Sequence, residues 1–141
     1  MADVTVTAAS VAPGSGAVYK QGVFGATTTA GQTAYLVTTA PTTPPTYGLC
    51  DANGTDELAT LAGVFMSTGA AGQPCTIQVS GSYNPGFTAT VGEIYVATAT
   101  AGGIALADDL ASGWKAGILG VAKTTSSIEL VIYNSLTALL A

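Results

Sequence analysis

One sequence unit occurs twice in this chain, at a constant offset of 41 positions from Gly22 to Gly63. Gly22-Val23-Phe24, followed by Ala30-Gly31-Gln32, returns without a gap as Gly63-Val64-Phe65, followed by Ala71-Gly72-Gln73. A shortened third copy begins at Gly120-Val121-Ala122. Repetition of so short a unit is typical of β-structure built by duplication, and it points away from a single catalytic site.

A longer correspondence extends this repeat. The segments that begin at Gly31 and Gly92 each lead through a loop to a glycine–apolar pair, then to a short acidic turn and a Gly-Val strand. We therefore expect two pseudo-repeats, at about residues 22–81 and 82–134. Short strands separated by turn residues, with 18 glycines in 141 residues, predict an all-β fold. The expected architecture is a compact antiparallel β-sandwich or a small barrel, with at most short helical turns.

The first 16 residues are expected to form an N-terminal arm. Residues 3–11 alternate in a way that predicts an extended edge strand, and Pro13-Gly14-Ser15-Gly16 then forms a hinge. The rest, residues 17–141, is expected to be a single β-rich domain that ends in a short apolar tail at 135–141. Such an arm can pair with the sheet of another molecule through its apolar residues, Val4, Val6, Ala8 and Val11. The alternative is a first strand that packs on its own domain.

The charge content constrains the partners. Only 8% of the residues are charged, against about 25% in an ordinary soluble domain, and the net charge is −5 with three lysines and no arginine. A surface this poor in charge favours burial in an oligomer, although Thr and Ser side chains also keep a surface hydrated. A nucleic-acid partner and an anionic membrane are both disfavoured because the chain lacks a basic surface. No apolar run approaches the roughly 18 residues of a membrane span, and no secretory signal is recognised.

The sequence contains no catalytic signature. Histidine, the usual base of a hydrolase, is absent, and no phosphate-binding glycine motif occurs. The acidic pairs Asp56-Glu57 and Asp108-Asp109 are interpreted as favourable partners of short helix dipoles. The segment from Asp51 to Glu57 resembles a calcium loop only faintly, because it lacks the acid at the third position and the glutamate at the twelfth. We therefore expect no enzyme activity, no metal and no cofactor.

Two cysteines, Cys50 and Cys75, stand 25 residues apart. This spacing, in a chain without histidine, does not suit a zinc site. Two small buried thiols are the favoured interpretation, and a single disulfide is the alternative.

Four segments carry a resemblance to a known family: residues 63–81, 91–96, 101–105 and 118–132. Their order and composition resemble tailed-bacteriophage virion proteins of the capsid decoration (cement), head-fibre and tail-fibre types. The resemblance covers about residues 60–134, with residues 18–50 as a weaker copy. No coiled-coil or collagen-like stalk is present, and this favours the compact decoration type over a long fibre.

The resemblance implies a non-enzymatic role. It implies a homotrimer on the outside of the assembled shell, in the virion after assembly in the host cytoplasm, that bridges subunits of the major capsid protein. Val4, Val6, Ala8 and Val11 would be the capsid contacts, and removal of residues 2–12 would then abolish binding without unfolding the protein. The alternative is a receptor- or glycan-binding fibre module with an exposed pocket at Tyr47, Tyr83 or Trp114.

Overall fold

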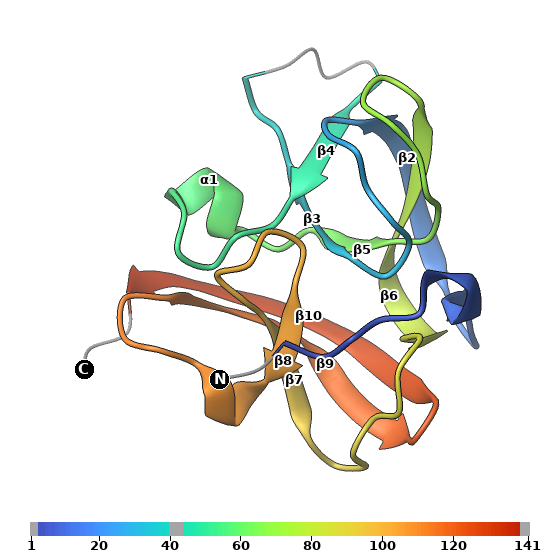
Figure 1. Ribbon diagram of the computed structural model, residues 1–141, viewed down its shortest axis with the longest axis vertical. Coiled ribbons are helices and arrows are strands. Elements are labelled where there is room, and N and C mark those ends of the chain that lie inside the picture. Colours follow the sequence, from blue (N-terminus) through green and yellow to red (C-terminus); the bar gives the residue numbers. More distant parts are fainter. Residues whose placement is uncertain (1–2, 40–43, 139–141) are drawn as a thin grey trace.

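The computed structural model describes residues 3–39 and 44–138, and these residues form an all-β fold with very little helix (Figure 1). The prediction of an all-β protein is confirmed. The strands are β1 Ala12–Pro13, β2 Val18–Phe24, β3 Thr33–Leu36, β4 Thr46–Leu49, β5 Gly63–Phe65, β6 Pro74–Asn84, β7 Ile94–Ala97, β8 Ile104–Leu106, β9 Lys115–Thr124 and β10 Ser127–Ala138. One α-helical turn, α1 Asp56–Ala59, and two 3-10 turns, η1 Ala8–Ser10 and η2 Ala107–Asp109, complete the described elements.

The strand pairings repeat along the chain. In the first unit the order is β4-β3-β5-β6, and in the second unit the order is β8-β7-β9-β10. Each unit also contains one helical turn at the same place along the chain. In the first unit α1 lies between β4 and β5, and in the second unit η2 lies between β8 and β9. Strand β2 pairs with β6 at the end of the first unit, and β6 pairs with β10 at the end of the second. The long strand β6 therefore serves both units, with residues 74–80 in one and 81–84 in the other.

The first unit is closed and the second is not. Strand β2 pairs antiparallel with β6 and parallel with β4, so that β2, β4, β3, β5 and β6 form a ring. The structure thus adopts the barrel alternative in this half, with one parallel pair in an otherwise antiparallel arrangement. In the second unit no pairing joins the corresponding strands, β6 and β8, within the described residues.

Reciprocal hydrogen bonds hold the repeated motifs together. The amide of Phe24, at the end of β2, donates to the Gln73 carbonyl at 2.9 Å, and the Gly72 amide donates to the Phe24 carbonyl at 2.8 Å. The same two bonds also form with the roles of the two copies exchanged. The Phe65 amide donates to the Gln32 carbonyl at 2.9 Å, and the Gly31 amide donates to the Phe65 carbonyl at 2.8 Å. Each Gly-Val-Phe strand end is therefore bound by the Ala-Gly-Gln turn of the other copy.

The turns of this motif require glycine. Gly31, Gly72 and Gly92 have φ values of +96°, +86° and +87°, in the left-handed region that other residues rarely adopt. The Gln32 side chain also accepts from the Thr29 amide at 2.8 Å, and Gln73 does the same for Ala70. The glycine supplies the backbone conformation and the glutamine closes the turn, so the Ala-Gly-Gln repeat has a local physical cause.

The core consists of two clusters, one among the ring strands and one to which both units contribute. The first lies among the ring strands and includes Phe24 and Phe65, whose ring centroids are 5.5 Å apart. The second fills the space under β7, β9 and β10, and its fully buried members include Tyr83, Leu119 and Ile128. The cysteines are free thiols in separate clusters, with Cys75 in the first and Cys50 in the second. The interpretation as two buried thiols agrees with this placement.

Two expectations about the chain ends are wrong. Residues 3–11 do not form an edge strand: they are irregular apart from η1, and the first strand is only Ala12–Pro13. At the other end, β10 continues to Ala138, so that residues 135–138 belong to the sheet and not to a separate tail. Residues 139–141 of the expected tail, and residues 1–2 of the expected arm, lie outside the described residues.

The Cys50 thiol should make the fold sensitive to alkali. Burial, with a smaller contribution from the nearby Asp51 carboxylate, raises the pKa of Cys50 from its ordinary 9.0 to about 12. Between these values the unfolded chain has released a proton that the folded chain retains. The stabilising contribution is therefore complete below pH 9 and is lost as the pH rises toward 12, at up to about 1.4 kcal/mol per pH unit.

We expect the wild type to lose about 1–2 kcal/mol more stability than Cys50→Ala between pH 7.5 and pH 10.5. Urea denaturation of both proteins at both pH values measures this difference. The remaining titrating groups are common to the two proteins and cancel in the comparison. Equal losses in the two proteins would contradict the burial of this thiol.

Candidate functional site

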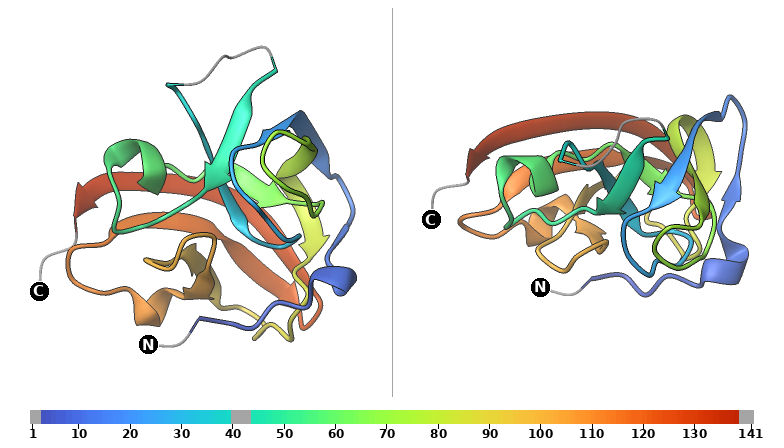
Figure 2. Two further views of the ribbon diagram at one scale, coloured as in Figure 1. Left: turned by 45° about the horizontal axis from the view of Figure 1, so that its top comes forward. Right: turned by 90° about the horizontal axis from the view of Figure 1, so that it is seen from above.

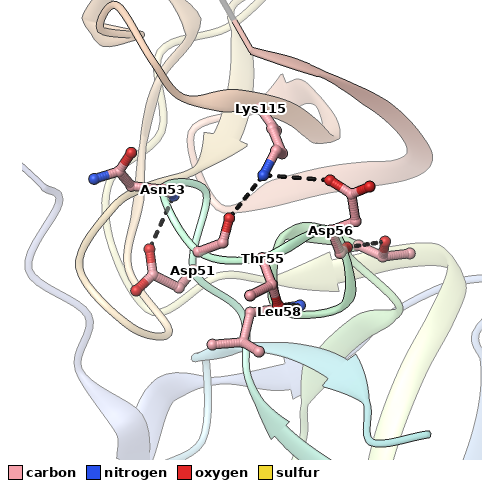
Figure 3. A network of polar contacts seen from close by, with 8 residues as sticks. Asp51, Asn53, Thr55, Asp56, Leu58 and Lys115 are labelled. Atoms are coloured by element: carbon pink, nitrogen blue, oxygen red, sulfur yellow. Dashed lines mark hydrogen bonds and ion pairs between the residues drawn. The ribbon is translucent and has the colours of Figure 1, made fainter.

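The acidic loop before α1 is occupied by a lysine. The Lys115 ammonium lies 3.3 Å from the Asp56 carboxylate and donates to the Gly54 carbonyl at 2.8 Å (Figure 3). Asp51 accepts from the Asn53 amide at 2.9 Å. Oxygen atoms of Asp51, Gly54 and Asp56, which a bound cation would need as ligands, therefore already have partners within the protein. The loop forms the cap of α1, and Lys115 is its counter-ion.

The described residues contain no group of three or more His, Cys, Asp or Glu side chains placed to hold a metal ion. The two acidic pairs lie in the first turns of α1 and η2, where carboxylates suit the helix dipole. Among the described residues, neither α1 nor the two 3-10 turns has the length and apolar character needed to span a bilayer.

The aromatic pocket expected at Tyr47, Tyr83 or Trp114 is not formed. These side chains are buried, with 4%, 1% and 7% of their surface exposed. The Tyr83 hydroxyl has no hydrogen-bond partner, and burial raises its pKa. These rings fill the core of an alanine-rich chain, so they are unavailable to an external sugar.

Three of the four residues expected to contact the capsid lie against their own chain. Val4 and Val11 are half-buried and pack against the second core cluster. Val6 and Val11 lie above Gly31 and Gly86, where a Cβ atom on either glycine would come within 3.1 Å of both valine side chains. Ala8 is half-buried and begins η1. The structure thus brings three of the four residues onto the domain surface.

The N-terminal segment spans the open side of the second unit. The Val4 amide donates to the Ile104 carbonyl of β8 at 2.9 Å, and the Thr7 amide donates to the Gly86 carbonyl at 2.8 Å. Farther along, Ala12 and Pro13 pair with Asn84 and Tyr83 of β6. Figures 1 and 2 show this segment running along the side of the domain from β8 to β6. It therefore links the two strands that leave the second unit open. We call residues 3–13 the arm and the surface that it covers the arm site.

The arm is flanked by two hollows. One, of about 210 Å³, is lined by residues that include Asp3, Val4 and Gln32. The other, of about 460 Å³, is a polar hollow lined by Thr5, Thr7, Ser10, Asn84, Gly86, Phe87, Thr88, Thr125 and Ser126. The second hollow combines hydroxyl and amide groups with one aromatic side chain, a composition that can hydrogen-bond a polar ligand.

A second exposed feature is an apolar face on β7, β9 and β10. In the strand register, Ile94 is opposite Val121, and Ile118 is opposite Tyr133. Residues opposite each other in an antiparallel pair project on the same side of the sheet. We call these four residues and Val131 the outer face. Tyr133 is 65% exposed, Val131 56% and Ile94 39%. In the view from above in Figure 2, β10 forms the outermost layer on this side.

The outer face carries one acid, and that acid is already bound. Glu129 lies opposite Val121 and accepts from the Ser82 hydroxyl at 2.9 Å. Large apolar side chains clustered on neighbouring strands mark a contact surface more strongly than the same residues scattered singly. The sequence analysis missed this face. Its signal is the uninterrupted apolar run Leu130-Val131-Ile132-Tyr133, which places apolar residues on both sides of β10.

Comparisons of the chain with protein-family models, with curated proteins and with solved structures gave no match.

Removal of residues 2–12 should destabilise the fold. The deletion removes the partly buried Val4 and Val11 and the backbone hydrogen bonds to Ile104 and Gly86, and we expect the free energy of unfolding to fall by roughly 2–4 kcal/mol. Urea denaturation measures the change. As a control, the exposed residues Thr5 and Ser10 can each be replaced by alanine, which should change stability by less than about 0.5 kcal/mol. An unchanged denaturation curve after the deletion would show that the arm is dispensable for folding.

Proposed function

We propose that this protein is a non-enzymatic structural component of a tailed-bacteriophage virion. In this proposal it is a homotrimeric decoration protein that binds the outside of the assembled shell and bridges subunits of the major capsid protein. The observation that carries the proposal is the outer face, a cluster of exposed apolar side chains on one side of β7, β9 and β10. The resemblance of residues 60–134 to virion proteins supports the same role.

The outer face supplies the free energy that such a role requires. Burial of an exposed Val, Ile or Tyr side chain contributes roughly 1–2 kcal/mol, and this face offers several on adjacent strands. A protein that binds the assembled shell, and not the free shell subunits, stabilises the shell by mass action. Three linked copies would multiply a modest affinity, because the second and third contacts form within one complex.

The electrostatics of the chain restrict the surface that it can bind. The net charge of −5 disfavours association with another strongly acidic surface. A shell surface that is apolar at the contact and neutral or basic around it fits these properties. Val4 and Val11 are less suitable as shell contacts, because both pack on the core of their own chain.

We expect the double substitution of Val131 and Tyr133 by lysine to reduce binding to virions by at least about tenfold, because two exposed apolar contacts become cations. Co-sedimentation with purified virions, over a range of protein concentrations, measures the affinity. The matched control is Leu36→Lys, which replaces a 41% exposed side chain on β3. An equal loss of binding with the control variant, or no loss with the double variant, would show that the outer face is not the contact.

A receptor- or glycan-binding role on a fibre is the second candidate, and the polar hollow of about 460 Å³ favours it. In this case Phe87→Ala should remove binding to any glycan that the wild-type protein retains on an array. Copy number separates the two roles. Quantitative mass spectrometry of purified virions should find hundreds of copies for a decoration protein, and a few to a few dozen for a fibre component. An array without any retained glycan counts against this second role.

A further inference from the structure

A short glycine-rich hinge, residues 14–16, connects the arm to the first unit. Only Gly14, Ser15 and Gly16 separate the arm from the chain that enters β2, and all three are exposed. Gly16 has a φ of +71°, and a Cβ atom on it would meet nothing closer than 3.9 Å. The hinge is bound to β6 at Ser82, whose carbonyl accepts from the Gly14 amide at 2.8 Å and whose amide donates to the Ser15 carbonyl at 2.9 Å. The turn also requires glycine at position 16, because of its left-handed backbone.

The hinge stands where the chain passes from one sheet to the other. On one side of it β1 pairs with residues 83–84 of β6, and on the other side β2 pairs with residues 74–80. The closed ring of the first unit does not include the arm. Consequently, the arm can leave the second unit while every strand pairing of the first unit remains.

The arm is also held by few contacts of its own. Its backbone is bound at Ile104, at Gly86 and along the two-residue strand β1. The flanking hollows leave parts of its surface without packed neighbours. One carboxylate oxygen of Asp3 is buried without a hydrogen-bond partner, although the other lies 3.2 Å from the Thr98 hydroxyl. Segments with so few contacts open at a lower free energy than core strands.

We propose that the arm is exchanged between copies: residues 3–13 of one copy fill the arm site of a second copy and join the two. Every contact that the arm makes within its own chain is available in the neighbouring copy, because the two arm sites are identical. The glycines of the hinge permit such an exchange, because glycine adopts other backbone conformations at little cost. The exchange rests on the association of copies included in the proposed function, and it assigns that association to a specific segment.

Two single-cysteine variants can detect the exchange. Ala12 and Asn84 are directly opposite each other in the register of β1 and β6, a separation that suits a disulfide. Ala12→Cys, carrying a tag that changes its size, is unfolded together with untagged Asn84→Cys and refolded with oxidised glutathione. The total concentration is about 1 mM, where pairing between chains can compete with a short linker. Each chain carries only one of the two new cysteines, so a disulfide between them must join two chains. Unfolding also exposes the native thiols of Cys50 and Cys75, so peptide mapping by mass spectrometry counts only the disulfide between the two introduced cysteines.

We expect a tagged–untagged disulfide dimer at several times the yield obtained when Asn84→Cys is replaced by Ala70→Cys. Ala70 is exposed and lies on the loop between β5 and β6, so this control measures random collision. A yield no higher than that of the control overturns the exchange. Virions that still hold hundreds of copies would leave the decoration role intact, so the two proposals can fail separately.

Substitution of Gly16 in the hinge gives a second, independent test of the exchange. Gly16→Val disfavours the left-handed backbone of the compact turn, and we expect it to raise the ratio of exchanged to unexchanged product by roughly tenfold. Gly92→Val is the matched control, because Gly92 has a φ of +87° and open space around it but lies far along the chain from the hinge. An equal rise in both variants would show that the effect is general destabilisation, and would overturn the role of the hinge.

Discussion

The fold depends on one repeated interaction, in which the end of a Gly-Val strand exchanges backbone hydrogen bonds with an x-Gly-Gln/Glu turn elsewhere in the chain. Phe24 makes these bonds with Gly72 and Gln73 of the second copy. Phe65 of the second copy makes the same bonds with Gly31 and Gln32 of the first. Gly92 and Glu93 make the third such exchange, with Ala122 of β9. Because each strand end is bound by a turn from a different segment, neither copy of the motif is complete alone. The duplication seen in the sequence is therefore a physical requirement of the fold.

Within the described residues, the buried side chains are apolar or uncharged. The polar backbone groups of the two repeats bond to one another. Phe24, Phe65, Ile77 and smaller residues fill the space between the ring strands. The few ionisable side chains near a possible site are neutralised locally, as Lys115 is by Asp56. Two features of the surface would carry the proposed assembly. These are the outer face and the arm site.

The all-β class and the glycine turns could be predicted from the sequence, because each depends on residues that are close together in the chain. The all-β class follows from short apolar runs between turn residues, and the turns at Gly31 and Gly72 need only glycine followed by glutamine. The arm strand could not be predicted, because the alternation of Val and Thr in residues 3–11 describes a segment that can pair but does not identify its partner. That segment meets Ile104 and Gly86, whose positions are set by the packing of the second unit.

The outer face could not be predicted for a different reason. Leu130 and Ile132 pack on the core while Val131 and Tyr133 are exposed, and an irregularity in the register between Leu130 and Tyr133 accompanies this change. An apolar run is normally evidence that both sides of a strand are buried. In β10 one of the two sides is open in the isolated chain, so the sequence describes a strand that is covered on both sides. In the proposed assembly, the exposed side of β10 is the area that a partner covers.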